Sequence, residues 1–240
     1  MANPIADKNA KLERQFVNFA FYKLDQAWLR LELDTRQKGA EELASTIETY
    51  SRKLIVYPYS TFGVRPDCDF LLWRISYKLE DFEEMSAAIR RTHMGSYLNT
   101  PHSFLAMTKT SIYVDDHVHD DQESVRNRIV VGGGKYLFVY PFVKSREWYL
   151  LSKEDRQTVM RQHIKLGHEF PSVKLNTTYS FGLDDQDFVV AFETNKPADF
   201  LDLVMALRET ESSRYTVRDT PIFTCTQQEI GCILNHVGGC

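Results

Sequence analysis

The sequence lacks any uninterrupted run of about 18 apolar residues, the length that a membrane-spanning helix needs. Its first residues also lack the basic, apolar and small-residue series of a secretory leader. Charge of one sign is not in large excess, because 29 Lys and Arg stand against 33 Asp and Glu. We therefore expect a cytoplasmic protein with no membrane span and no general affinity for nucleic acid.

Cysteine is also scarce, with 4 residues in 240 and no Cys-x-x-Cys pair. Reduced structural thiols are the simplest interpretation for such a chain in the cytoplasm. The alternative is a metal site on the glycine-containing C-terminal tail, where Cys232, His236 and Cys240 occur. We expect this tail to be loosely ordered.

The chain repeats itself at an offset of 118 residues. Asp69-Phe70 is matched by Asp187-Phe188, and Asp81-Phe82 is matched by Asp199-Phe200. We interpret this as an α+β protein of two tandem ferredoxin-like halves, which close into one subunit of the dimeric α+β barrel type with helices outside. The expected organisation is a flexible arm (1–14), an N-terminal half (15–100), a connecting loop region (101–134), a C-terminal half (135–226) and a tail (227–240).

Residue patterns place the main elements within these halves. Alternating or apolar runs predict strands over 16–22 and 70–75, while helical composition covers 28–33, 40–55 and a segment beginning at Asp81. The glycines 132–134 follow Arg126-Asn127-Arg128, but no Lys-Ser/Thr pair or opening helix follows them, so the P-loop and dinucleotide patterns are excluded. The connecting region is long for an ordinary loop, and we expect it to be functional.

The densest pattern lies in the C-terminal half. An apolar run over 136–140 predicts a strand that Pro141 ends or bulges, because proline cannot donate to a sheet ladder. Ser152 with Asp155 predicts the start of a helix, and one face of that helix carries Val159, His163, Leu166 and Phe170. From spacing alone, His163 on an apolar face is more often a core residue than a metal ligand.

The runs YPFVKSREWYLL and MRQHIKLGHEFPSVK resemble the chlorite dismutase and coproheme decarboxylase family. The resemblance implies that His163 is the proximal ligand of a haem iron, with coproheme or haem b as the cofactor. It also implies that Glu211 orients the imidazole and that Trp148 belongs to the haem pocket. Only the C-terminal half carries this motif, since Ser45 stands at the offset of His163.

The residue expected on the distal side of the haem differs between the chlorite dismutases and the decarboxylases of the family. Chlorite dismutases have a distal arginine where this sequence has Leu175, and a neutral side chain cannot stabilise an anionic oxidant. Some decarboxylases draw a distal histidine from the upstream loop, for which His117 and His119 are both candidates. The alternative for that stretch is a solvated acidic loop, with a separate metal site as a further one.

Tyr140 and Lys144 form the Tyr-Pro-x-x-Lys step that resembles the decarboxylase signature, in which the tyrosine is redox-active. The resemblance assigns Lys144 to holding a propionate carboxylate as a point charge. It assigns Arg128, Arg208 and Ser213 to carboxylate anchoring as well. The alternative for each basic residue is a surface charge.

These observations favour a peroxide-dependent coproheme decarboxylase, which converts two propionates of iron coproporphyrin III to vinyls and yields haem b. The alternatives are a chlorite dismutase-like haem peroxidase and a non-catalytic haem-binding sensor or chaperone. Expected partners are the porphyrin substrate and hydrogen peroxide. The resemblance further implies a homopentamer and a transient contact with coproporphyrin ferrochelatase.

Overall fold

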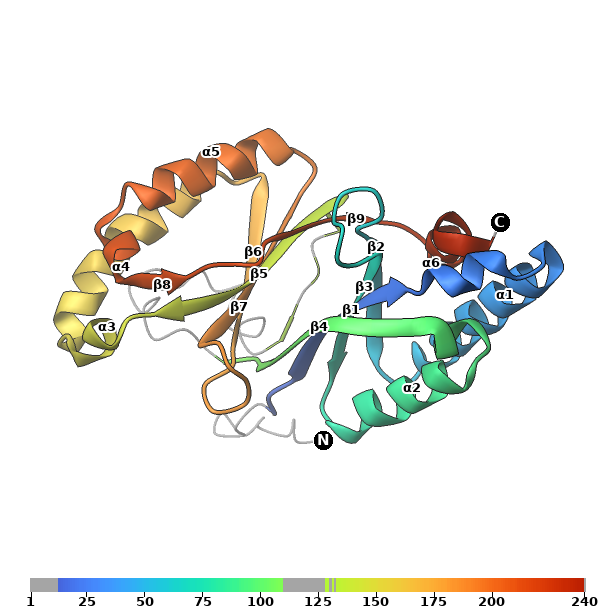
Figure 1. Cartoon of the computed structure of the whole chain (residues 1–240). Coiled ribbons are helices and arrows are strands. Elements are labelled where there is room, and N and C mark those ends of the chain that lie inside the picture. Colours follow the sequence, from blue (N-terminus) through green and yellow to red (C-terminus); the bar gives the residue numbers. More distant parts are fainter. Residues whose placement is uncertain (1–12, 110–127, 130, 132, 240) are drawn as a thin grey trace, which may run out of the picture.

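The computed structural model describes residues 13–109, 128–129, 131 and 133–239, which form two halves around one antiparallel sheet (Figure 1). The first half contains β1 (Phe16–Leu24), η1 (Gln26–Arg30), α1 (Leu33–Tyr50), β2 (Ile55–Ser60), β3 (Phe70–Ser76), α2 (Glu80–Arg91), η2 (Met94–Tyr97) and β4 (Leu98–Met107). The second half contains β5 (Tyr136–Lys144), α3 (Arg146–Leu150), α4 (Lys153–His168), β6 (Val173–Tyr179), β7 (Phe188–Thr194), α5 (Pro197–Arg208), η3 (Glu211–Tyr215), β8 (Thr216–Arg218) and β9 (Phe223–Gln227). The C-terminal segment adds α6 (Ile230–Leu234) and η4 (Asn235–Gly239).

The order of elements is the same in both halves. Each runs from a strand through a short helical turn and a long helix to two strands, a second long helix, a 3-10 turn and a final strand, which is split into β8 and β9 in the second half. The expected α+β fold of two ferredoxin-like halves is confirmed.

The two halves share a sheet that closes on itself. Its strand order is β7-β6-β4-β1-β3-β2-β9-β5-β8, and β7 also pairs with β5. The halves join along two short seams: Met107 pairs with Tyr179 between β4 and β6, while Tyr59 and Ser60 pair with Gln227 and Thr226 between β2 and β9. Closure leaves few open strand edges, which is the usual way in which a barrel avoids edge-to-edge association.

Strand alternation divides the core into three layers. Successive side chains of a strand point to opposite faces. In β1, Phe19 and Phe21 enter a cluster of strand residues inside the barrel, whereas Ala20 and Tyr22 pack toward α1 and α2. The second half repeats the arrangement around β5 and β7. Figure 1 shows α3, α4 and α5 on one side of the strands and α1, α2 and α6 on the other.

The C-terminal tail is part of the core of the first half, which differs from the expected loose order. Ile230, Ile233, Leu234 and Val237 are buried against the cluster beneath α1. Trp28, fully buried in η1, donates its indole N–H to the carbonyl of Gly238 at 3.0 Å. Burial of these four apolar side chains anchors the segment. Their spacing was a sign of this packing, although the glycines of the tail favoured loose order. Within the described residues, which exclude Cys240, no group of three or more His, Cys, Asp or Glu residues could hold a metal.

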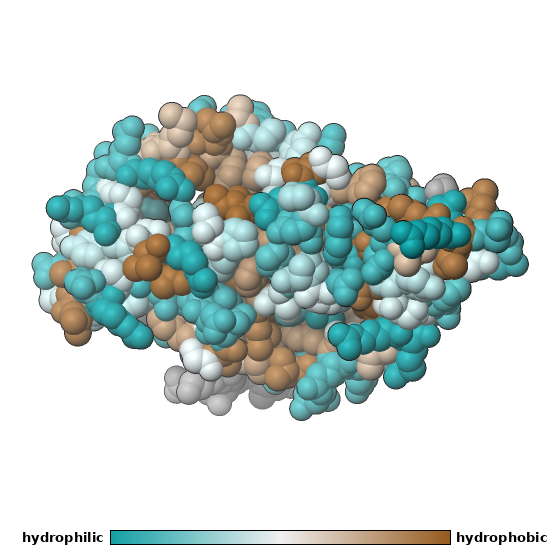
Figure 2. Space-filling view, in the orientation of Figure 1, coloured by the Kyte–Doolittle hydropathy of each residue, from teal (hydrophilic) through white to brown (hydrophobic). Residues whose placement is uncertain are grey.

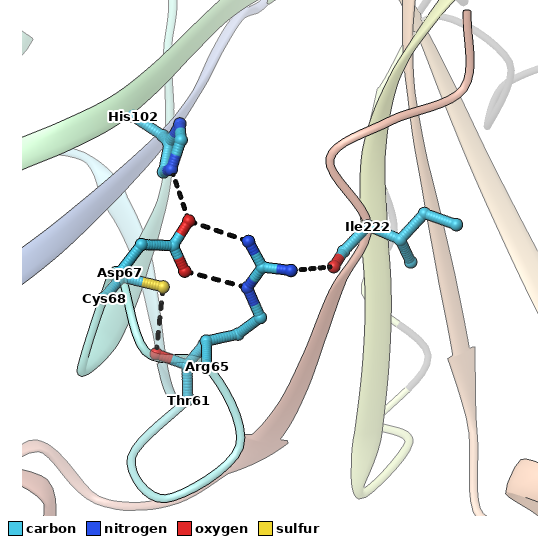
Figure 3. Close-up of polar contacts among 6 residues, drawn as sticks. All are labelled: Thr61, Arg65, Asp67, Cys68, His102 and Ile222. Carbon is cyan, nitrogen blue, oxygen red and sulfur yellow. Dashed lines mark hydrogen bonds and ion pairs between the residues drawn. The ribbon is translucent and has the colours of Figure 1, made fainter.

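A polar cluster links the first half to the segment that enters β9 (Figure 3). The Arg65 guanidinium donates to both carboxylate oxygens of Asp67 at 2.9 and 2.7 Å, and it also donates to the carbonyl of Ile222 at 3.3 Å. Nε2 of His102 lies 2.8 Å from the Asp67 carboxylate. Arg65 also lies over the Phe223 ring, 4.8 Å from its centroid. The cluster therefore ties β4 and the β2–β3 loop to the second half.

Two expected boundaries differ from the structure. The helix expected over 40–55 ends at Tyr50, and Ile55 instead begins β2, where it pairs with Ile75 of β3. β4 continues to Met107, beyond residue 100 where we expected the first half to end, because it pairs with β1 along its length. Among the helices of the described residues, none is long and apolar enough to cross a membrane.

Candidate functional site

The sheet presents an aromatic wall to α4 and α5. In β5, Phe138 and Tyr140 point toward these helices, while Leu137 and Val139 between them point into the barrel. Phe192 of β7 lies beside Tyr140, with ring centroids 6.0 Å apart. On the helix side, Phe200 stacks on Phe138 at 4.0 Å. The strand expected over 136–140 thus places Tyr140 on the face that looks toward the helices.

Helix α4 begins where the sequence predicts. The hydroxyl of Ser152 accepts a hydrogen bond from the backbone N–H of Asp155 at 3.1 Å, as in an N-terminal cap. The face that carries Val159, His163 and Leu166 is half-buried, and no side chain of α4 is fully buried. The equivalent helix α1 in the first half buries Leu43 and Ile47 completely or nearly so. The described residues therefore cover the inner face of α4 only in part.

His163 is held by a neighbour from the turn after α5. Its Nδ1 lies 3.0 Å from the hydroxyl oxygen of Ser212, which is 2% exposed. Burial, and then the positive charge of Lys144, lower the pKa of His163 to about 4. The imidazole is therefore neutral at pH 7, which is the state in which a histidine nitrogen binds a metal.

The expected partner of this imidazole, Glu211, has another contact. Its carboxylate accepts a hydrogen bond from Arg214 at 3.0 Å, and the residue is exposed. The side chains of Thr210 and Ser212 lie together on one side of the turn, because their hydroxyl oxygens are 3.1 Å apart, whereas the Glu211 carboxylate is turned to Arg214. The structure brings Ser212 to His163 in place of the adjacent carboxylate.

Lys144 contacts the same turn, η3, through its side chain. Its ammonium donates to the backbone carbonyl of Ser212 at 2.6 Å and sits over the Trp148 ring, 4.8 Å from the centroid. Burial lowers the pKa of Lys144 to about 8. Its backbone N–H donates to Asp187, whose carboxylate also accepts from the hydroxyl of Tyr149. The ammonium therefore holds the Ser212 turn, and its expected contact with a propionate stays a prediction.

Tyr140 is 7% exposed and lies near a charged pair at the end of α5. Burial raises the pKa of its phenol above the ordinary value, the negative charge of Asp219 raises it further, and the positive charge of Arg208 opposes both. Arg208 itself donates to Asp219 at 2.6 Å. The phenol is thus protonated at neutral pH, with a guanidinium within electrostatic range.

The remaining predicted residues are spread more widely. The Ser213 hydroxyl donates to the backbone carbonyl of Arg208 at 2.7 Å, so it braces the end of α5. Trp148 is 2% exposed and packs against Tyr215, while Leu175 on β6 is 46% exposed. Arg128 is exposed on a segment whose Ile129 packs on the barrel interior. His117 and His119 lie outside the described residues.

The residues of this layer fit a haem. A porphyrin needs apolar walls, an axial donor and cations for its carboxylates. The aromatic wall and the incompletely covered face of α4 supply the apolar walls. The neutral imidazole of His163 supplies the axial donor, and Arg208 supplies a cation. Arg156 lies seven residues before His163 on α4, and its Nε is buried without a hydrogen-bond partner among the described residues. Sequence reasoning missed Arg156, although it lies two turns before His163 on the same helix.

Comparisons with known proteins agree with this arrangement. The sequence profile of the chlorite dismutase family matches residues 36–228. A coproheme decarboxylase of Mycolicibacterium smegmatis is 31% identical over 196 residues, which cover 80% of this chain and 81% of that protein. A chlorite dismutase of Ideonella dechloratans is 29% identical over 206 residues, which cover 85% of this chain and 72% of that protein.

Solved structures show the same fold. A chlorite dismutase from Candidatus Nitrospira defluvii in complex with imidazole matches with a TM-score of 0.84 and 26% identity, over 93% of this chain and 95% of its own. A heme-binding protein from Thermus thermophilus matches with a TM-score of 0.83 and 23% identity, over 95% and 96% of the two chains. The profile spans most of the sequence, and a relative above 30% identity covers most of its length, so this chain belongs to the chlorite dismutase family.

Proposed function

We propose that this protein binds haem through His163 and acts as a peroxide-dependent coproheme decarboxylase. The observation that carries the proposal is Tyr140, a buried phenol on the strand face that looks toward α4, four residues before Lys144. The Lys144 ammonium lies near the same helices, because it donates to the carbonyl of Ser212, whose hydroxyl contacts His163. The 31% identity to a coproheme decarboxylase supports the same assignment.

Bound haem iron would supply the oxidation by peroxide. For each propionate, the side chain –CH2–CH2–COOH and one H2O2 give –CH=CH2, CO2 and two H2O, so atoms and electrons balance. Tyr140, once oxidised, takes a hydrogen atom from the propionate carbon next to the ring. Its burial in an aromatic layer excludes water from the phenol, which protects a reactive group from side reactions.

The cations of the layer would hold the carboxylates. Arg208 lies at the end of α5 near Tyr140, and Arg156 carries a buried Nε on the face of α4 that includes His163. Guanidinium groups bind carboxylates through paired N–H donors, which fixes orientation as well as charge. We propose that Arg208, together with Arg128 and Ser213 as the family resemblance implies, positions a propionate for Tyr140.

Chlorite dismutation is the second candidate, because a chlorite dismutase is 29% identical to this chain. The structure offers one observation against it: Leu175, where family members of that activity carry an arginine, is an apolar side chain on β6. No positive charge at that position would stabilise chlorite or hypochlorite. A non-catalytic haem sensor or chaperone is the third candidate, and the buried Tyr140 disfavours it.

The direct test is mass analysis of the porphyrin after coproheme-loaded protein receives peroxide. Two successive losses of a formic-acid equivalent from the porphyrin support the proposal. Oxygen release from chlorite over many turnovers would support the second candidate instead. Haem binding with neither reaction would support the sensor or chaperone.

We also propose a cytoplasmic homopentamer that takes its substrate from coproporphyrin ferrochelatase. Apolar residues gather on the surface in the region of α5 (Figure 2). Leu201 and Met205 of this helix are 56% and 61% exposed. They stand one turn apart on the helix, as residues of a packing face do. Light scattering at micromolar concentration tests the assembly, and a monomeric mass would contradict it.

A further inference from the structure

The hydroxyl of Thr210 donates its proton to a backbone carbonyl. Its oxygen lies 2.7 Å from the backbone carbonyl oxygen of Leu207. A carbonyl oxygen can only accept, so at this distance the hydroxyl must donate. Thr210 is 4% exposed, which leaves its remaining lone pairs to be satisfied within the protein.

The next group along the chain of contacts is the hydroxyl of Ser212, whose oxygen lies 3.1 Å from that of Thr210. Since the Thr210 proton points to Leu207, only Ser212 can donate in this pair. A hydroxyl has one proton, so Ser212 then has only lone pairs for its other neighbour. That neighbour is Nδ1 of His163 at 3.0 Å.

We propose that Thr210 and Ser212 form a hydroxyl relay that fixes His163 as the tautomer protonated on Nδ1, so that Nε2 presents its lone pair. Two acceptors cannot face each other across 3.0 Å, so Nδ1 must carry the proton once Ser212 donates to Thr210. Ser212 and Thr210 are positioning residues, and the proposal rests on the proposed role of His163 as the iron ligand. The relay is complete in the protein without haem.

Lys144 holds the relay in place. Its ammonium donates to the backbone carbonyl of Ser212 at 2.6 Å, so the turn cannot rotate without breaking that bond. Glu211, the carboxylate on the turn, is engaged by Arg214. His163 therefore donates to a neutral hydroxyl. A neutral acceptor makes a histidine a weaker electron donor than a carboxylate does, so the relay also sets the basicity of the proposed ligand.

The test reads the tautomer of His163 in protein that contains no haem. Protein labelled with 15N on histidine gives long-range proton–nitrogen correlation spectra, in which the two ring nitrogens have different shifts when only one is protonated. The His163 signals are identified by their loss in His163→Ala. We expect the wild type to be protonated on Nδ1, with that tautomer favoured by roughly five- to tenfold, the ratio that one hydrogen bond of this kind provides.

Two variants at residue 210 test the direction of the relay. Thr210→Val removes the acceptor for Ser212, whose proton is then free to point at Nδ1, so the tautomer protonated on Nε2 should gain at least severalfold in population. Thr210→Ser keeps the hydroxyl and should retain the wild-type ratio. Ser212→Ala removes the hydroxyl that accepts the Nδ1 proton, so it should lower the share of the tautomer protonated on Nδ1.

A wild-type imidazole protonated on Nε2, or a ratio that Thr210→Val leaves unchanged, would overturn the relay. These outcomes leave the proposed function open to its own test, because the measurement uses no iron. Conversely, if His163→Ala leaves the haem spectrum unchanged, the ligand assignment fails while the tautomer result stands. Ser212→Asp adds a second readout: it should lower the reduction potential of the haem-loaded protein, since a carboxylate strengthens the donor.

Discussion

Nδ1 of His163 and the hydroxyl oxygen of Ser212 are 3.0 Å apart, although the two residues are separated by 49 positions in the sequence. The contact joins α4 to the turn that follows α5, and Lys144 of β5 holds that turn through its ammonium. The imidazole on α4 is therefore held by a turn that β5 in turn holds. An imidazole whose hydrogen-bond partner is itself fixed keeps the orientation that a metal ligand needs.

The first prediction concerns His163→Ala. Because His163 is half-buried on a helix that has no fully buried side chain, the change should lower the free energy of unfolding by only about 1 kcal/mol. Coproheme should bind more weakly and with an altered ferric absorption spectrum. Absorption titration measures both effects. His168→Ala, at the exposed end of the same helix, is the matched control and should titrate like the wild type.

The second prediction concerns chlorite. The proposed function places Leu175 on the distal side of the haem, so we expect negligible oxygen release and rapid bleaching of haem, because a neutral side chain does not stabilise the departing anion. Leu175→Arg should raise the initial rate of oxygen release, whereas the neutral Leu175→Gln should not. An oxygen electrode records all three proteins. Sustained oxygen evolution by the wild type would contradict the argument from the missing cation.

The third prediction concerns the polar cluster of Figure 3. Hydrogen bonds from Arg65, above all, and from His102 hold the pKa of Asp67 well below its usual range. A carboxylate with a lowered folded-state pKa stabilises the protein above its unfolded pKa of about 3.9, and this contribution is lost as pH falls below that value. Asp67→Asn should therefore lower the free energy of unfolding at pH 7 by about 1–2 kcal/mol. The variant should also lose less of this free energy than the wild type does as the pH falls.

Urea unfolding from pH 7 down to about pH 2 measures this effect, because the contribution is lost only below the unfolded pKa. Asp34→Asn is the control, because Asp34 pairs with Lys38 on the exposed face of α1 and an exposed pair contributes little. An Asp67→Asn protein with wild-type stability and wild-type acid sensitivity would show that the cluster does not link the halves energetically.

Local sequence patterns predicted the secondary structure of the C-terminal half well. The run over 136–140 and the cap at Ser152 are where the sequence indicates, because alternation and capping are short-range effects. Pro141 was expected to end or bulge the strand, yet β5 continues to Lys144. It is tolerated because β9 pairs with β5 only as far as Val139 and β8 pairs from Val143, with a register shift between Val143 and Lys144, so Pro141 falls in the gap between these two neighbours.

Contacts that depend on tertiary packing could not be read from the sequence. A one-residue difference in the turn after α5 decides whether Glu211 or Ser212 faces His163, and side-chain direction there follows from backbone angles that no motif specifies. The tail is buried at Ile233 and Val237 because it packs on the cluster beneath α1, at the other end of the chain, a contact that the composition of the tail does not indicate. Spacing located the helix that carries His163, and three-dimensional packing selected its partner.

The most direct test of the account is a single-turnover comparison of Tyr140→Phe with Tyr136→Phe. Both variants remove one phenolic hydroxyl from the same strand, and both keep the ring. Each variant is loaded with coproheme and receives stoichiometric peroxide under anaerobic conditions. Mass analysis then follows the substrate, the singly decarboxylated intermediate and the product. We expect Tyr140→Phe to bind coproheme almost as the wild type does but to bleach it without forming vinyl groups, whereas Tyr136→Phe forms haem b. A wild-type yield of haem b from Tyr140→Phe would contradict the mechanism.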